Sequence, residues 1–243
     1  MNVWERRIER ALVLEREYPA ATELLEFYRQ IAGFQKKMGT LTGQARAVPH
    51  VPAQLPESLQ PHMVPLLLML QHSAPEPLAG VARNLLYTDD WDPADPAPNF
   101  ILRVLMQPYL EQLASRTRFD KPVSAPICPF CEEHPLASVL RPEGEGGKRS
   151  LICSLCFTEW DFRRLLCPKC GEENHQKLPV FTAGQFPHVR IEACDTCRTY
   201  IKSIDMTRNG LALPEVDELA SLPLDLWAGQ NGYTKLQPNL FGL

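Results

Sequence analysis

The 243-residue sequence contains no long apolar segment and no excess of positive charge. Its longest uninterrupted apolar run covers residues 66–70, far short of the roughly 20 residues that span a bilayer. No apolar signal core follows the charged residues at its start, so we expect no membrane segment and a cytoplasmic location. The net charge of −4 also argues against a nucleic-acid-binding protein, since such proteins usually carry a basic excess.

Cysteine is absent from residues 1–127, and glycine is scarce there. Apolar residues instead recur at helical spacing, which predicts helices near residues 1–18, 20–38, 58–72, 76–87 and 100–116. Proline-rich loops separate these segments. We therefore expect an all-α helical bundle over residues 1–120. A linker at 121–127, also rich in proline, predicts that this bundle and the rest of the chain form separate cores.

All eight cysteines lie in four Cys-x-x-Cys pairs, and none is left over. The pairs are Cys128/Cys131, Cys153/Cys156, Cys167/Cys170 and Cys194/Cys197. A two-residue spacer lets two sulfurs turn toward one point, so each pair is half of a tetrahedral four-sulfur metal site. Four such halves predict two complete four-cysteine sites, and hence two metal ions per chain.

The four pairs form a repeat in which two β-prone stretches around a turn lie between one pair and the next. Pair, hairpin, pair is the layout of a zinc ribbon or rubredoxin-like module. We predict one module at 128–166 and a second at 167–208, each binding its own metal ion. Each hairpin has too little apolar material to fold unaided, so the metal must stabilise it. The expected fold is α+β: helical bundle, two tandem four-cysteine modules, and a short helical tail at 209–243 that packs back on the bundle.

Two other arrangements of the cysteines are possible. Joining Cys153/Cys156 to Cys167/Cys170 would use pairs close in sequence, but it would break the repeat. Four disulfides would require an oxidising compartment, which the start of the chain does not suggest. Among metals, tetrahedral sulfur ligation suits Zn²⁺ and a single Fe equally, and the sequence does not distinguish them.

No set of residues predicts catalysis, so we expect a protein that is not an enzyme. The stretch Gly144-Glu-Gly-Gly-Lys148 faintly resembles a phosphate-binding loop, but Arg149 follows where Ser or Thr would bind magnesium. Residues 128–205 hold ten Lys and Arg against eleven Asp and Glu, so the cysteine region has no basic excess either. We expect no nucleic-acid partner.

The cysteine region resembles a known family. The resemblance rests on Cys-Pro-Phe-Cys, on the stretches 150–160, 164–171 and 192–202 around the other three pairs, and on the tail at 217–228. In these stretches the chain is similar to the formate dehydrogenase accessory protein family, FdhE. Residues 18–28 resemble the family more weakly. Glu132 stands where the family has a glycine, which Gly171 keeps in the second module.

The resemblance implies a cytoplasmic assembly factor that binds the catalytic subunit of formate dehydrogenase before its twin-arginine export. It also implies rubredoxin-like iron, carried over onto the eight matching cysteines. Two other functions stay open from the residues alone. One is a rubredoxin-like electron-transfer protein with a single iron bound by four cysteines. The other is a zinc-ribbon scaffold or nucleic-acid binder outside formate metabolism.

Overall fold

The structure is a computed structural model that describes residues 2–39, 55–88 and 96–243. Its helices and strands follow one another in this order: α1 (Val3–Glu17), α2 (Thr22–Lys37), α3 (Gln60–Ser73), α4 (Leu78–Leu85), α5 (Pro96–Arg116), β1 (Pro135–Glu143), β2 (Gly146–Cys153), β3 (Glu159–Asp161), β4 (Val180–Thr182), β5 (Val189–Cys194), β6 (Thr199–Asp205), α6 (Pro214–Ala220), α7 (Leu222–Gln230) and β7 (Thr234–Lys235). Short 3-10 turns occur at Pro19–Ala21, Glu57–Leu59 and His175–Lys177. The predicted α+β class and order of parts are confirmed.

Local sequence explains where the helices begin and end. Asn2 caps α1 through a capping box, in which Asn2 and Glu5 each accept a backbone hydrogen bond of 2.9 Å from the other. Helix α5 begins at Pro96, before the predicted start at 100, because proline is tolerated in the first turn of a helix. The prolines inside α3 and α5, Pro65 and Pro108, do not end either helix. Most of the predicted proline-rich loops falls on residues 40–54 and 89–95, which lie outside the described residues.

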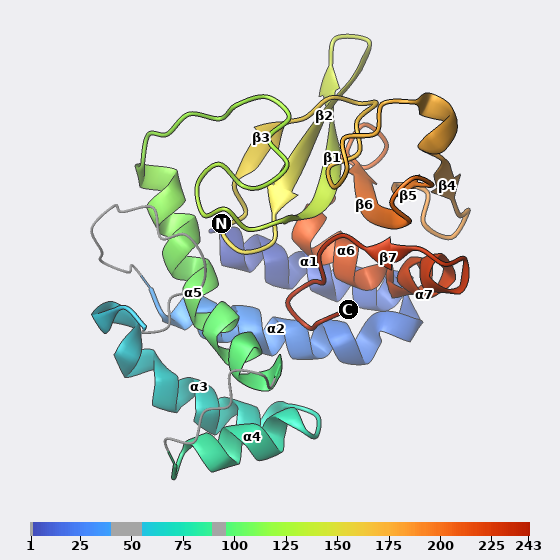
Figure 1. Cartoon of the computed structure of the whole chain (residues 1–243). Coiled ribbons are helices and arrows are strands. Elements are labelled where there is room, and N and C mark those ends of the chain that lie inside the picture. The colour runs from blue at the N-terminus through green and yellow to red at the C-terminus, as the bar shows by residue number, and fades with distance from the viewer. Residues whose placement is uncertain (1, 40–54, 89–95) are drawn as a thin grey trace.

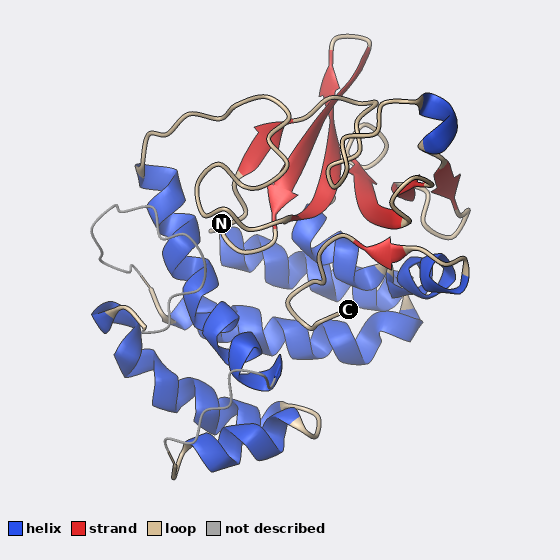
Figure 2. Ribbon diagram, viewed as in Figure 1, coloured by secondary structure: helices blue, strands red, loops and turns tan. Residues whose placement is uncertain are grey.

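The six strands of the two cysteine modules, together with β7 of the C-terminal segment, form one seven-stranded sheet, which lies above the helices in Figures 1 and 2. Its order is β3-β2-β1-β6-β5-β4, with β7 also paired to β6. Each module supplies antiparallel pairs, and the modules join where β1 runs parallel to β6, with Ala137 opposite Lys202. Because a shared sheet fixes the two hairpins relative to each other, the two modules are not structurally independent units.

One apolar cluster unites the helices with the first module. It contains Ile31 from α2, Leu66 from α3 and Leu105 from α5, together with Leu151 and Trp160 from the sheet. All four cysteines of the first module belong to the same cluster. The prediction of separate cores is therefore wrong: the proline-rich linker is itself anchored, with the Trp160 indole donating to the Ala125 carbonyl at 2.9 Å.

The C-terminal segment bridges the helices and the sheet. Val216 and Leu219 of α6 pack with Leu14 and Leu25 from α1 and α2. Helix α7 packs against the second module, with Leu224 in an apolar cluster that includes residues of strand β5. No helix among the described residues is both long enough and apolar enough to cross a membrane.

Candidate metal centres

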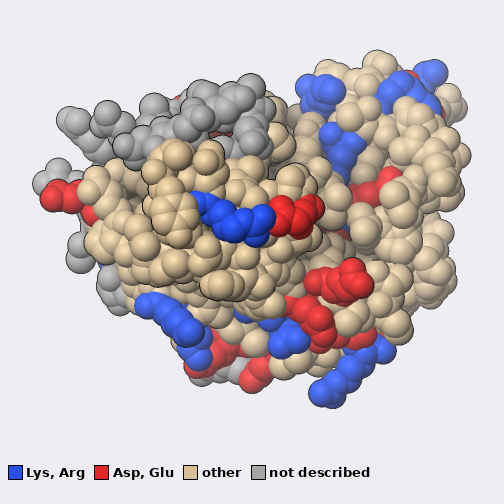
Figure 3. All heavy atoms as spheres, turned by 90° about the horizontal axis from the view of Figure 1, so that it is seen from below, with Lys and Arg blue, Asp and Glu red and all other residues tan. Residues whose placement is uncertain are grey.

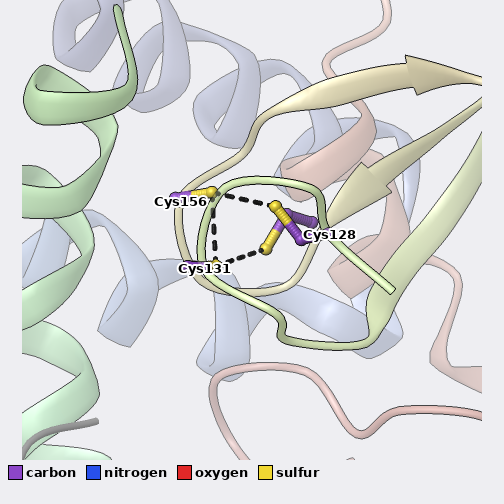
Figure 4. Close-up of side chains that lie close together, drawn as sticks. Cys128, Cys131 and Cys156 are labelled. Atoms are coloured by element: carbon purple, nitrogen blue, oxygen red, sulfur yellow. Dashed lines mark hydrogen bonds between the residues drawn. The ribbon is translucent and has the colours of Figure 1, made fainter. Parts of the chain in front are cut away.

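The first group of cysteines comes from the two turns at one end of the β1–β2 hairpin. Cys128 and Cys131 precede β1, Cys153 ends β2, and Cys156 lies in the turn before β3. Their sulfurs point toward one another, as Figure 4 shows for three of them. The Sγ–Sγ distances are 3.5 Å for Cys128–Cys156, 3.4 Å for Cys131–Cys153 and 3.5 Å for Cys131–Cys156. All four residues are buried.

The second group repeats this arrangement in the second module. The Sγ atoms of Cys167 and Cys197 lie 3.7 Å apart, and those of Cys170 and Cys194 lie 3.6 Å apart. Here the surroundings differ, because Cys170 is exposed and Cys197 is partly exposed. The predicted grouping of the cysteines is thus confirmed in both modules, and the pairing of Cys153/Cys156 with Cys167/Cys170 is wrong.

The geometry of both groups fits a tetrahedral metal ion. Four sulfurs about 2.3 Å from a central ion lie about 3.8 Å from one another, close to the distances of 3.4 Å to 3.7 Å found here. A disulfide would need about 2.05 Å. Each group could therefore hold one ion, and the four thiolates would fill its coordination sphere. The geometry suits zinc and iron equally.

The backbone folds the same way after every cysteine pair. The residue that follows the second cysteine has a positive φ in all four cases: Glu132 (62°), Phe157 (52°), Gly171 (73°) and Arg198 (56°). This turn lets backbone amides face the sulfurs, and the amide of Phe130 donates to Cys128 Sγ at 3.4 Å. Only one of the four is glycine, although L side chains disfavour this conformation by about 1–2 kcal/mol. The other three residues adopt this conformation despite the local preference, so all four turns keep the same geometry.

The thiols cannot all ionise by themselves. In the first group the pKa of Cys128 is lowered because Cys131, Cys153 and Cys156 donate hydrogen bonds to it, whereas burial raises the pKa of Cys153. In the second group burial raises the pKa of Cys167 to about 12. Burial opposes ionisation of Cys197 too, but hydrogen bonds from Thr199 and the neighbouring thiols lower its pKa to about 7. Binding a divalent ion would displace the remaining protons.

Helices hold the first group from one side. Arg103 of α5 donates to Ser154, between Cys153 and Cys156, at 3.1 Å (Oγ) and 3.3 Å (O). The Arg7 guanidinium of α1 lies 4.5 Å from the ring centre of Phe157, the residue after Cys156. These contacts, invisible in the sequence pattern, make the first group part of the interface between helices and sheet.

A partly buried ionic cluster joins the two modules, and the sequence pattern did not predict it. Glu192 of β5 accepts hydrogen bonds from Arg149 of β2 at 2.9 Å and from Arg190 at 2.9 Å. Arg149 also donates to the carbonyls of Arg163 at 2.8 Å and Leu166 at 3.4 Å, in the segment between the modules. Burial opposes ionisation of Glu192, but the two arginines outweigh it and lower the pKa to about 2.

These features define a class: a metal-binding protein with two zinc-ribbon-like four-cysteine modules in one sheet, supported by helices. Two family models match it. The model described as "FdhE, central domain" matches residues 127–164, and "FdhE, C-terminal domain" matches residues 165–241. These matches, together with a relative from Shewanella oneidensis that is 30% identical over 95% of the chain, show that the chain belongs to the FdhE family.

Individual relatives agree. A protein FdhE homolog of Shewanella oneidensis is 30% identical over 259 residues, covering 95% of this chain and 85% of that protein. One from Aquifex aeolicus is 34% identical over 151 residues, covering 61% of this chain but only 53% of that protein. The crystal structure of the FdhE protein from Pseudomonas aeruginosa has the same fold, with a TM-score of 0.72 and 23% identity over 98% of this chain and 95% of that one.

Proposed function

We propose that this protein is a cytoplasmic accessory factor that binds the catalytic subunit of formate dehydrogenase during its assembly and has no turnover of its own. Membership of the FdhE family carries the proposal. Two closed four-sulfur sites support a binding role, because a filled coordination sphere leaves no position for a substrate.

We further propose that all eight cysteines are metal ligands, in the two groups described above. On this proposal the first ion fixes the two cysteine turns that pack against the helices, and the second stabilises the outer end of the sheet. When bound, each ion supplies a cross-link between two cysteine turns. The chain itself provides the positive-φ turns and the sulfur-facing amides that fix the thiols in place.

The test is capture of one named partner by the intact chain. Tagged full-length protein, expressed in a host that makes formate dehydrogenase but lacks its own FdhE, should co-purify with the catalytic subunit, measured by mass spectrometry. Formate dehydrogenase activity should return in the same cells. Fragments are unsuitable because the helices and the first module share a core.

Exposed positions provide the variants. A substitution such as Leu211→Glu, on a side chain that is 81% exposed, should leave the fold intact. Its effect on capture of the catalytic subunit therefore tests whether the surface around Leu211 contacts the partner. Recovered activity without any bound catalytic subunit would contradict a binding factor. Capture of unrelated proteins in equal amounts would contradict it as well.

Electron transfer is the second candidate, and one observation favours it. The second cysteine group has an exposed member, Cys170, and a redox centre must lie near the surface to exchange electrons with a partner. An oxidised iron centre with four cysteine ligands is red and bleaches on reduction, whereas a zinc site is colourless. Spectra of protein purified without air, before and after dithionite, show whether the metal is iron, and a colourless protein would contradict electron transfer.

Nucleic-acid binding has less support. The helical face seen in Figure 3 carries Lys and Arg together with Asp and Glu in small groups of both signs. A phosphate-binding surface would concentrate one sign. A gel-shift experiment with duplex and single-stranded DNA at physiological salt should show no complex.

A further inference from the structure

The two cysteine groups differ in how easily a dissolved reagent reaches them. No cysteine of the first group is more than 1% exposed, and all four lie inside the main apolar cluster. In the second group Cys170 is exposed and Cys197 is partly exposed. A reagent therefore reaches the second group in the folded protein, whereas it reaches the first group only when the surrounding core opens.

A cavity of about 360 Å³ also borders the second group. Cys167 and Cys194 line it, although they are only 5% and 2% exposed. Among the described residues one carboxylate, Glu192, lines this cavity, against four cations: Arg149, Arg164, Lys169 and Arg190. Reactive cysteines are typically found in such surroundings, partly exposed and electropositive. Access and charge thus both mark the second group as the reactive one.

The sulfurs of the second group are close enough to join with a small movement. The Sγ atoms of Cys170 and Cys194 lie 3.6 Å apart, and a disulfide needs about 2.05 Å. Cys131 and Cys153 of the first group are equally close, with 3.4 Å between their Sγ atoms. Proximity alone would therefore allow a disulfide in either group, and access by the oxidant decides between them.

The second module has other contacts that hold it when its cysteine turns are released. Ile191 of β5 and Tyr200 of β6 lie in an apolar cluster with residues of α7. Lys202 of β6 is bonded to Glu218 of α6 at 2.8 Å in the buried ionic group. None of these contacts involves a cysteine. Release of the two turns should consequently leave strands β5 and β6 in place.

We propose that Cys170 is an oxidation site, through which a peroxide opens the second metal centre. The Cys170 thiolate attacks one peroxide oxygen, the O–O bond breaks, and a sulfenic acid forms as hydroxide leaves. The Cys194 thiolate then attacks the Cys170 sulfur, so that a disulfide forms and a second hydroxide leaves. The two sulfurs together lose two electrons, and the peroxide takes these with two protons and ends as two waters.

Oxidation leaves only Cys167 and Cys197 as thiolates, too few for a tetrahedral four-sulfur site, so the second ion dissociates. The proposal rests on the ligation of the second group proposed above and on no partner protein. It makes the second centre sensitive to oxidants, while the first centre keeps its ion.

The test uses full-length protein loaded with zinc to two ions per chain and then treated with hydrogen peroxide. A chromogenic indicator should record the release of one ion, with the other released at least about tenfold more slowly. Differential alkylation and mass spectrometry should map a Cys170–Cys194 disulfide and unoxidised thiols in the first group. Dithiothreitol and fresh zinc should restore two ions per chain.

Hydrogen exchange measures the structural consequence on the same samples. Residues 167–178 and 194–198, which contain the two cysteine turns, should lose protection after peroxide treatment. Residues 128–161 and the helices should keep theirs, because the first group is enclosed in the main apolar cluster.

Two matched variants separate Cys170 from the other exposed ligand. Cys170→His can still bind zinc, since three cysteines and one histidine form a common zinc site, but it cannot form the disulfide. Release of the second ion should slow at least about tenfold in this variant. Cys197→His keeps Cys170 and Cys194 and should release its ion at the parental rate. The disulfide map of the parent protein remains decisive if either variant fails to load.

Release of one ion together with the Cys170–Cys194 disulfide supports the proposal. Equal rates for both ions would overturn it, as would a disulfide confined to the first group or retention of both ions. A disulfide from Cys170 to Cys167 or Cys197 would overturn the role of Cys194. Zinc content below two ions before peroxide would overturn the proposed ligation itself, so the two failures are distinguishable.

Discussion

The two cysteine groups share a sequence motif and a local geometry, yet they differ in what surrounds them. The first lies inside the main apolar cluster, between helices and sheet, with every sulfur buried. The second lies at the outer side of the sheet, with Cys170 exposed. Identical ligands therefore serve different structural roles, because the contacts around a metal site decide what depends on it.

The means of anchoring differ as well. The first module is held to the helices by the main apolar cluster and by the Arg103–Ser154 contact. The second packs on α7 through an apolar cluster of its own and is held in addition to α6, α7 and β7 by a buried ionic group, in which Lys202 of β6 bonds Glu218 at 2.8 Å and Asp225 at 2.6 Å. Lys235 of β7 pairs with the same two acids. Acid and metal removal should consequently affect the two modules in different ways.

The largest expected effect comes from removing one ion. Cys153→Ser with Cys156→Ser should cost the first ion and unfold the helices too, since a four-thiolate site is worth on the order of 10 kcal/mol and a domain only about 5–15 kcal/mol. Cys170→Ser with Cys197→Ser should cost the second ion and leave the helical far-UV signal intact. Circular dichroism and metal content per chain measure both. Retained helices in the first variant would show that the shared core survives without its metal.

The next effect is a dependence of stability on acid. Burial opposes ionisation of Glu218, but Lys202 and Lys235 outweigh it and lower the pKa from 4.5 to about 2. Because the folded-state pKa is lowered, the ionised Glu218 carboxylate stabilises the folded protein above pH 4.5. This contribution, roughly 3 kcal/mol, is lost as the pH falls toward 2. Glu218→Gln should flatten the acid limb of the stability curve relative to the parent.

Exposed Glu145→Gln is the control for this measurement and should leave the curve unchanged. Comparing the variants at equal metal content separates the Glu218 contribution from acid release of the ions. Parallel acid limbs in parent and Glu218→Gln would show that the ionic group does not anchor the second module.

A smaller difference should appear in the rates of metal loss. A chelator reaches the second group through local opening around Cys170, whereas the first group opens only with the surrounding core. Excess chelator should thus extract metal in two phases of equal amplitude, with the faster at least about tenfold quicker. The faster phase should vanish in the Cys170→Ser, Cys197→Ser protein. A single phase would mean that exposure does not control release.

The sequence predicted what depends on local spacing. Helical periodicity located the helices, and the Cys-x-x-Cys repeat grouped all eight cysteines correctly. The sequence did not predict the parallel pairing of β1 with β6 or the Arg149–Glu192 ion pair, because both join residues that lie far apart in the chain. The shared core was missed for the same reason: proline in the linker indicates a turn, but not what the turn packs against.

The smallest effect concerns the residue after the first cysteine pair of each module, Glu132 in one and Gly171 in the other. Both have a positive φ, which costs an L side chain about 1–2 kcal/mol and glycine nothing. Glu132→Gly should raise stability by up to about 1 kcal/mol, since the added unfolded-state entropy of glycine offsets part of the relief. Gly171→Ala should lower it by about 1 kcal/mol. Gly184→Ala, in open space and without a positive φ, is the control. Thermal melts of the metal-loaded proteins should therefore shift in opposite directions by about 2–4 °C. Shifts of the same sign would show that the metal, rather than the turn residue, sets the backbone strain in these two turns.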